Sequence, residues 1–185
     1  TDLALPFSDP TAGGGFVTIV ENAGQSKAQG IELETTIAIT DDFTIRSAVG
    51  YLDSEITEVA EGVQGIGKGD SPALTPRWTV MVAPSYFVDL SNGGTVALNA
   101  NYSYRSEMQG QSVFNKSETI DSRELVGFNI SYTNAYGDME VTLYGENVLN
   151  EVYDVGRLQQ SGFVGVMRSN DRSEFGLKFK KDFEL

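Results

Sequence analysis

The side chains that come nearest to a catalytic arrangement are Glu140, Tyr144 and Glu146, which lie on a stretch of alternating residues. Two carboxyl groups can serve as general acid and general base when a cleft holds a substrate between them. Histidine, the commonest general base, is absent from the sequence, and so is cysteine. Ser-His-Asp and Cys-His catalysis are therefore excluded within this chain, and we predict no enzymatic activity and no catalytic residue.

Metal and phosphate chemistry is also weakly supported. Asp53, Glu55 and Glu58 could offer carboxylate oxygens to a hard cation, but a solvated strand end explains them more simply. Four glycines between residues 62 and 69 are not followed by a helix signal or by the Lys-Ser/Thr pair of a phosphate-binding loop. We predict no metal site and no cofactor, and we interpret residues 62–69 as a flexible loop.

The net charge of −13 argues against a nucleic-acid partner, because binding to phosphates needs a basic surface. A well-solvated surface accounts for the charge, and acidic outer loops or a cation-attracting lumen are alternatives. No run of about 18 apolar residues occurs, so a membrane-spanning helix is not expected.

The elements that must position these side chains are strands, because apolar and polar residues alternate along most of the chain. The alternation is clearest over residues 96–104 and 175–183. Connections alternate between short turns and long loops, as in membrane β-barrels. After a loop at residues 1–15, the pattern predicts seven antiparallel strands, at residues 16–40, 43–51, 78–90, 96–108, 126–132, 139–145 and 175–183.

Opposite the apolar positions lie charged residues, and we predict that Arg46, Arg105, Glu140 and Glu146 face a lumen. The two arginines could meet an anionic ligand, although pairing with Glu140 or Glu146 is the simpler interpretation. Bacterial single-chain barrels generally have an even number of strands. A count of seven therefore favours part of a larger barrel.

Short motifs then occur in a characteristic order. They are Asn22-Ala23-Gly24 with Gly30-Ile31-Glu32-Leu33-Glu34, Gly50-Tyr51-Leu52-Asp53-Ser54-Glu55, Leu74-Thr75-Pro76-Arg77-Trp78-Thr79, Tyr102-Ser103-Tyr104-Arg105-Ser106, and Gly145-Glu146-Asn147-Val148-Leu149-Asn150-Glu151-Val152-Tyr153. In this order and spacing, residues 16–183 resemble the C-terminal part of the barrel of TonB-dependent outer-membrane receptors. The chain departs from the family pattern at its end, where Glu184 and Leu185 follow the aromatic Phe183.

The resemblance implies a barrel of about 22 strands with a separate plug, in the outer membrane of a Gram-negative bacterium. Expected partners are the lipid bilayer, the plug and remaining barrel, TonB and the barrel-assembly machinery. The expected activity is uptake of a scarce or bulky nutrient such as a siderophore, haem, cobalamin or an oligosaccharide. Loops 62–76, 109–122 and 150–171 would capture the ligand, with candidate contacts from Phe114, Asn115, Gln159 and Phe163. Phe179 and Phe183 would form the assembly signal.

Two alternatives stay open at this point. A true turn at Asn22-Ala23-Gly24 would give a small eight-stranded outer-membrane barrel with a structural or adhesive role. A soluble ligand-binding barrel would instead hide its apolar side chains in its interior.

Overall fold

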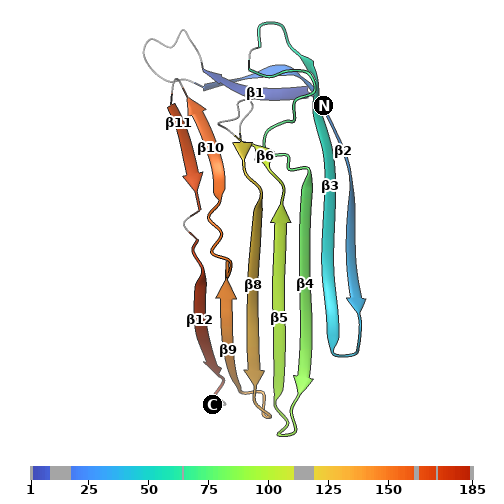
Figure 1. Cartoon of the computed structure of the whole chain (residues 1–185), viewed down its shortest axis with the longest axis vertical. Helices are drawn as coiled ribbons and strands as arrows, with labels where there is room; N and C mark the ends of the chain where they lie inside the picture. Colours follow the sequence, from blue (N-terminus) through green and yellow to red (C-terminus); the bar gives the residue numbers. More distant parts are fainter. Residues whose placement is uncertain are drawn as a thin grey trace.

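A computed structural model describes residues 2–8, 18–63, 65–110, 119–160, 163–169 and 171–183 of the 185-residue chain. Each regular element in these ranges is a β-strand, and each strand pair is antiparallel (Figure 1). No helix in the described part of the chain has the length and apolar character needed to cross a membrane. The predicted all-β, antiparallel fold is confirmed.

The main sheet has eight strands in the order β1-β2-β3-β4-β5-β8-β9-β12. Their bounds are β1 (Asp2–Ser8), β2 (Thr18–Ala38), β3 (Phe43–Val59), β4 (Trp78–Asp89), β5 (Thr95–Arg105), β8 (Arg123–Thr133), β9 (Met139–Glu146) and β12 (Glu174–Lys181). Two small ladders lie outside it, β6 (Met108–Gln109) with β7 (Thr119–Ile120) and β10 (Asp154–Gln160) with β11 (Phe163–Arg168).

The connections alternate in length as the sequence predicts. Short turns at residues 39–42, 90–94 and 134–138 lie at one end of the sheet, and the long connections lie at the other (Figure 1). We call the second end the outer end. In the turn between β8 and β9, hydrogen bonds from Lys181 and then from Asn134 hold the pKa of Asp138 below its usual range. The Lys181–Asp138 pair also ties the end of β12 to this turn.

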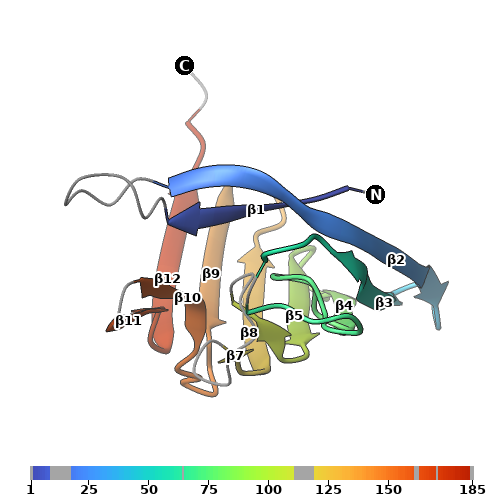
Figure 2. The ribbon, with the colours of Figure 1, turned by 90° about the horizontal axis from the view of Figure 1, so that it is seen from above.

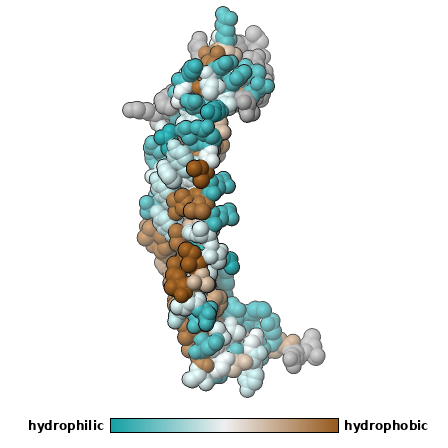
Figure 3. All heavy atoms as spheres, turned by 90° about the vertical axis from the view of Figure 1, so that its right-hand side faces the viewer, coloured by the Kyte–Doolittle hydropathy of each residue, from teal (hydrophilic) through white to brown (hydrophobic). Residues whose placement is uncertain are grey.

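The strand register sorts the side chains onto two faces, because directly paired residues in antiparallel strands point the same way. One face is apolar, and Figure 3 shows apolar residues gathered part of the way along the molecule with polar residues towards both ends. Leu33 and Leu177 on this face are 60% and 70% exposed. The buried hydrophobic residues in the described part of the chain are only Ala23, Ile56 and Ile120. A soluble barrel with an apolar interior is therefore disfavoured.

Three parts of the predicted organisation need correction. Residues 2–8 were expected in a loop but form β1, whose residues pair with Thr18–Gln25 of β2. The predicted loop 150–171 contains the hairpin of β10 and β11, and the predicted loop 109–122 contains β7 together with the end of β6. β2 continues through Asn22, Ala23 and Gly24 without a hairpin turn, as the seven-strand interpretation requires.

Pro84 lies within β4 and weakens the ladder, because proline has no N–H to donate. The pairing of β4 with β5 stops after Val82 and resumes, in the same register, at Ser85. Pro84 still pairs with Ile45 on the β3 side.

The sheet is open, with β1 and β12 as its two edges. Seen from above, β1 and the first part of β2 lie across the sheet: β1 runs towards the β12 side, and β2 returns from there towards the β3 side (Figure 2). Among the described residues, β1 pairs only with Thr18–Gln25, so the later part of β2 has a described strand partner on the β3 side alone.

Candidate ligand-binding cavity

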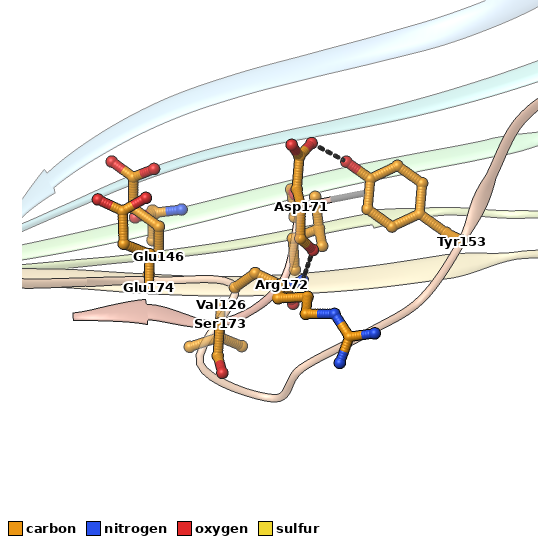
Figure 4. Close-up of a pocket in the computed structure, with 12 residues that line it drawn as sticks. Val126, Glu146, Tyr153, Asp171, Arg172, Ser173 and Glu174 are labelled. Atoms are coloured by element: carbon orange, nitrogen blue, oxygen red, sulfur yellow. Dashed lines mark hydrogen bonds between the residues drawn. The ribbon is translucent and has the colours of Figure 1, made fainter. Parts of the chain in front are cut away.

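A cavity of about 630 Å³ lies on the polar face, where β5 and β8 meet the outer ends of β9 and β12. Strand residues on its wall include Asn101, Ser103 and Glu146, and the connections on either side of the β10–β11 hairpin add Tyr153, Asp171 and Arg172. Figure 4 labels Glu146, Tyr153, Asp171 and Arg172 among the side chains that line the cavity. The cavity is therefore built jointly by regular strands and by the connections that leave them.

Asn147 ties the two connections together. Its Nδ2 donates hydrogen bonds to the carbonyl oxygens of Glu151, at 2.9 Å, and Asp171, at 2.7 Å. Its Oδ1 accepts a hydrogen bond from the N–H of Glu151 at 2.9 Å. The backbone of Asn147 has a φ of 44°, in the left-handed region that asparagine tolerates better than most residues. The structure thus supports the structural role that side-chain-to-backbone bonding implies for an asparagine at a strand end.

Replacing Asn147 by alanine should loosen the β10–β11 hairpin. The variant loses three hydrogen bonds and forces alanine into a left-handed conformation, and each bond contributes about 1 kcal/mol. We expect amide hydrogen exchange across β10 and β11 to be faster by a factor on the order of 100, which corresponds to about 3 kcal/mol. Asn147→Gly is the control, because glycine adopts the same φ without strain; it should show a smaller increase. Unchanged exchange in Asn147→Ala would contradict this role.

Three carboxylates, those of Glu146, Asp171 and Glu174, line the cavity. Glu146 and Glu174 are direct cross-strand partners, and like charges in such positions are destabilising. The hydroxyl of Tyr144 donates to Glu174 Oε1 at 2.8 Å, and that of Tyr153 donates to Asp171 Oδ2 at 3.3 Å (Figure 4). These carboxylates can accept hydrogen bonds from a polar or cationic ligand. No group of three or more potential metal-ligating side chains occurs among the residues that the structure describes.

The β10–β11 hairpin is held by ion pairs around the buried carboxylate of Asp154. Asp154 Oδ2 accepts from Arg157 Nη2 at 2.7 Å, and its Oδ1 accepts from Arg168 Nε at 2.9 Å. Burial works against the charged carboxylate, but the hydrogen bonds from Arg168 and Arg157 outweigh it and lower the pKa of Asp154. Asp154 therefore stays ionised and fixes the start of β10 to the end of β11.

The structure places the predicted ligand contacts apart from this cavity or leaves them untested. Phe114 and Asn115 lie outside the described residues. The backbones of Gln159 and Phe163 lie near the tip of the β10–β11 hairpin, and their side chains are outside what the structure describes. Their role in ligand contact stays a prediction.

The four residues predicted to face a lumen share one face of the sheet. The register places Arg46, Arg105, Glu140 and Glu146 opposite the apolar face. Only Glu146 lines the cavity. Neither arginine forms an ion pair with a described residue, so the expected pairing with Glu140 or Glu146 is not found. Glu140 Oε1 instead accepts from the Thr142 hydroxyl at 2.9 Å.

The predicted assembly signal lies at the other end of β12. Phe179 is on the apolar face, paired with Val141, and Phe183 follows the end of the strand. Both rings are exposed, Phe183 by 79%. This position is compatible with recognition by another protein, which stays a prediction.

Sequence reasoning missed Asp171, Arg172 and Ser173, because residues near the end of an irregular connection carry no periodic signal. Tyr153 was marked only as the last position of the Asn147–Tyr153 motif. Its contact with Asp171 depends on how the two connections pack, which local sequence does not encode.

An open antiparallel sheet with one exposed apolar face, a polar face and a cavity at its outer end has the architecture of a section of membrane β-barrel wall. The TonB dependent receptor-like β-barrel family matches residues 1–150. The chain belongs to this family, whose members are outer-membrane receptors of Gram-negative bacteria that transport ligands and are not enzymes. A comparison with curated protein sequences found no match.

Several solved structures have a similar fold. The ferric yersiniabactin uptake receptor of Yersinia pestis is 14% identical with a TM-score of 0.75, over 90% of this chain and 25% of the receptor. The ferric preacinetobactin receptor of Acinetobacter baumannii is 19% identical with a TM-score of 0.67, over 97% and 26%. A siderophore receptor of Acinetobacter baumannii is 18% identical with a TM-score of 0.68, over 98% and 24%. The chain spans about a quarter of the length of these receptors.

Proposed function

We propose that this chain is the C-terminal part of the barrel of an outer-membrane active-transport receptor. The receptor would take up a scarce or bulky nutrient with energy from the TonB complex. Its further partners would be the lipid bilayer, the remaining barrel and plug, and the barrel-assembly machinery.

The observation that carries this proposal is the separation of the two faces in a sheet with open edges. The apolar face suits hydrocarbon, and the polar face suits a plugged lumen. An unpaired strand edge cannot face lipid, because no water is present there to satisfy its N–H and C=O groups. The side of β12 that faces away from β9 therefore requires a further strand. The later part of β2 requires one on the side that faces away from β3.

A siderophore-type iron chelate is the ligand class that we favour. Two of the similar solved structures are named as receptors of ferric compounds and a third as a siderophore receptor. The cavity of about 630 Å³ is large enough for a group on such a molecule. Ligand capture at the outer loops, with contacts from Phe114, Asn115, Gln159 and Phe163, belongs to the same proposal.

The test is the mass and location of the native polypeptide, detected with an antibody against residues 139–185 in fractionated cells. Because the chain covers 25% of its structural neighbour, we expect an outer-membrane species of about four times its 20.1 kDa. A species of 20.1 kDa in the outer membrane would support the small autonomous barrel instead. A species in the soluble fraction would overturn both membrane proposals.

The substrate requires a second measurement. A deletion strain should grow poorly under iron limitation when its iron is supplied as a chelate that the receptor takes up, and the restored gene should rescue it. Equal growth of the two strains on a panel of ferric siderophores would reject the iron-chelate assignment while leaving outer-membrane location intact.

A further inference from the structure

Two arginines face each other on the polar face at the outer end of the sheet. Arg105, the last residue of β5, is the direct cross-strand partner of Arg123, the first residue of β8. Side chains in such positions leave Cβ atoms about 4.5–5.5 Å apart, and like charges there repel each other. This pairing lowers the stability of the sheet unless a negatively charged group lies between or beside the two guanidinium groups.

The described residues offer no carboxylate that offsets this repulsion. Neither Arg105 nor Arg123 forms a salt bridge within the described part of the chain. The nearby Asp121 gives only its carbonyl oxygen to Arg105 Nη2, at 3.0 Å, while its carboxylate lies 4.0 Å from Arg157. Among the described basic residues without an ion pair, Arg105 and Arg123 are direct cross-strand partners of each other.

Arg105 is also incompletely hydrogen-bonded. Its Nε is buried and has no hydrogen-bond partner. Its Nη1 contacts only the sulfur of Met108, at 3.6 Å, and a thioether is a weak acceptor. A buried polar group without a partner in a native protein calls for an explanation, and a missing ion is one of the usual ones.

The second guanidinium is held towards the cavity. Arg123 lies over the ring of Tyr153, with 4.8 Å between its Cζ and the ring centroid. Tyr153 itself lines the cavity. The stack fixes the plane of Arg123 while leaving its N–H groups free to donate outward. Tyr153 therefore connects the arginine pair to the cavity, whose lining also includes Glu146 and Glu174, although neither arginine lines the cavity itself.

We propose that Arg105 and Arg123 bind an anionic group, a carboxylate or a phosphate, of a small molecule that enters from the outer end. An anion between the two guanidinium groups replaces their repulsion with two charge-assisted interactions, and the planar fork of arginine matches both groups. The inference rests on the proposed function only in taking the polar face as the interior of the receptor.

The test uses the full-length receptor in detergent micelles, titrated calorimetrically with inorganic phosphate and, separately, with citrate. Arg105→Gln and Arg123→Gln should each weaken binding by about ten- to a hundredfold, the usual effect of losing a hydrogen bond to a charged group. Arg77→Gln is the matched control, because it removes the same charge from an arginine that pairs with Asp53 at 3.6 Å. It should leave binding unchanged.

Further variants separate geometry from charge. Arg123→Lys should bind more weakly than the wild type but more tightly than Arg123→Gln, because lysine keeps the charge and loses the fork. Arg123 is half-buried at the first position of β8, so we expect its variants to fold. If Arg105→Gln does not fold, the comparison of Arg123→Lys with Arg123→Gln still tests anion binding. Absence of binding by the wild type, or equal losses in Arg77→Gln and the two test variants, would overturn the proposal. These readings come from purified protein, so they are independent of location and uptake in cells.

Discussion

Replacing Leu143 with arginine should greatly reduce the amount of folded receptor in the outer membrane. Leu143 lies on the apolar face between Ile130 and Leu177 and is 45% exposed. If this face meets hydrocarbon, an arginine near the membrane midplane costs about 2–4 kcal/mol, which corresponds to a roughly 30- to 1000-fold shift in the folding equilibrium. Heat-modifiable mobility on gels measures the folded fraction of receptor in isolated membranes.

The adjacent residue provides the matched control. Thr142 lies on the polar face, where its hydroxyl donates to Glu140 Oε1 at 2.9 Å. Thr142→Arg adds the same side chain one residue away and places it beside a carboxylate, so we expect a small effect. Equal losses for the two variants would show that the apolar face does not meet lipid. A greater loss of folded receptor for Thr142→Arg would show that the face bearing Thr142, and not the apolar face, meets the lipid.

Replacing Gly30 by alanine should destabilise the pairing of β2 with β3. A Cβ on Gly30 would lie 2.3 Å from the carbonyl oxygen of Tyr51, which belongs to the backbone and cannot rotate away. The two strands must separate locally, and overpacking of this kind costs about 1–3 kcal/mol. We expect the denaturant midpoint of the receptor, measured by tyrosine and tryptophan fluorescence in micelles, to fall accordingly.

Ala28→Ser is the control for Gly30→Ala. Both changes add one heavy atom to the same face of β2, and Ala28 pairs with Ser54 in the same ladder as Gly30 with Leu52. Ala28 already carries a Cβ, so its variant should unfold near the wild-type midpoint. Equal midpoints for Gly30→Ala and the wild type would show that the backbones do not approach as closely as the structure indicates.

The motif glycines illustrate what sequence reasoning could and could not supply. Gly24 and Gly30 were recognised as part of a characteristic strand, but their reason was not apparent. In the structure, a Cβ at Gly24 would lie 2.0 Å from the carbonyl oxygen of Glu58, and the residue has a φ of 140°. These close approaches involve a neighbouring strand more than 20 residues away. The close approaches become apparent only when the pairing register of β2 with β3 is known.

The sequence by itself determined β2, β3, β4, β5, β8, β9 and β12, their two faces and the alternation of turns and loops between them. These properties are local, because a period of two places every second side chain on the same side whatever the strand pairs with. The order of the short motifs indicated the family. The alternation of side chains along each strand was enough to place Arg46, Arg105, Glu140 and Glu146 on the polar face.

The tertiary structure decided the pairing of β1 with β2, the β10–β11 hairpin, the cavity and the facing arginines. Each depends on contacts between residues far apart in the chain, such as Asn147 with Asp171 or Arg105 with Arg123. Local patterns do not specify such contacts, because irregular connections lack a period and register is fixed by the packing of whole strands. The alternation of side chains thus defined the wall of the barrel, while the packing of its outer connections created the candidate sites.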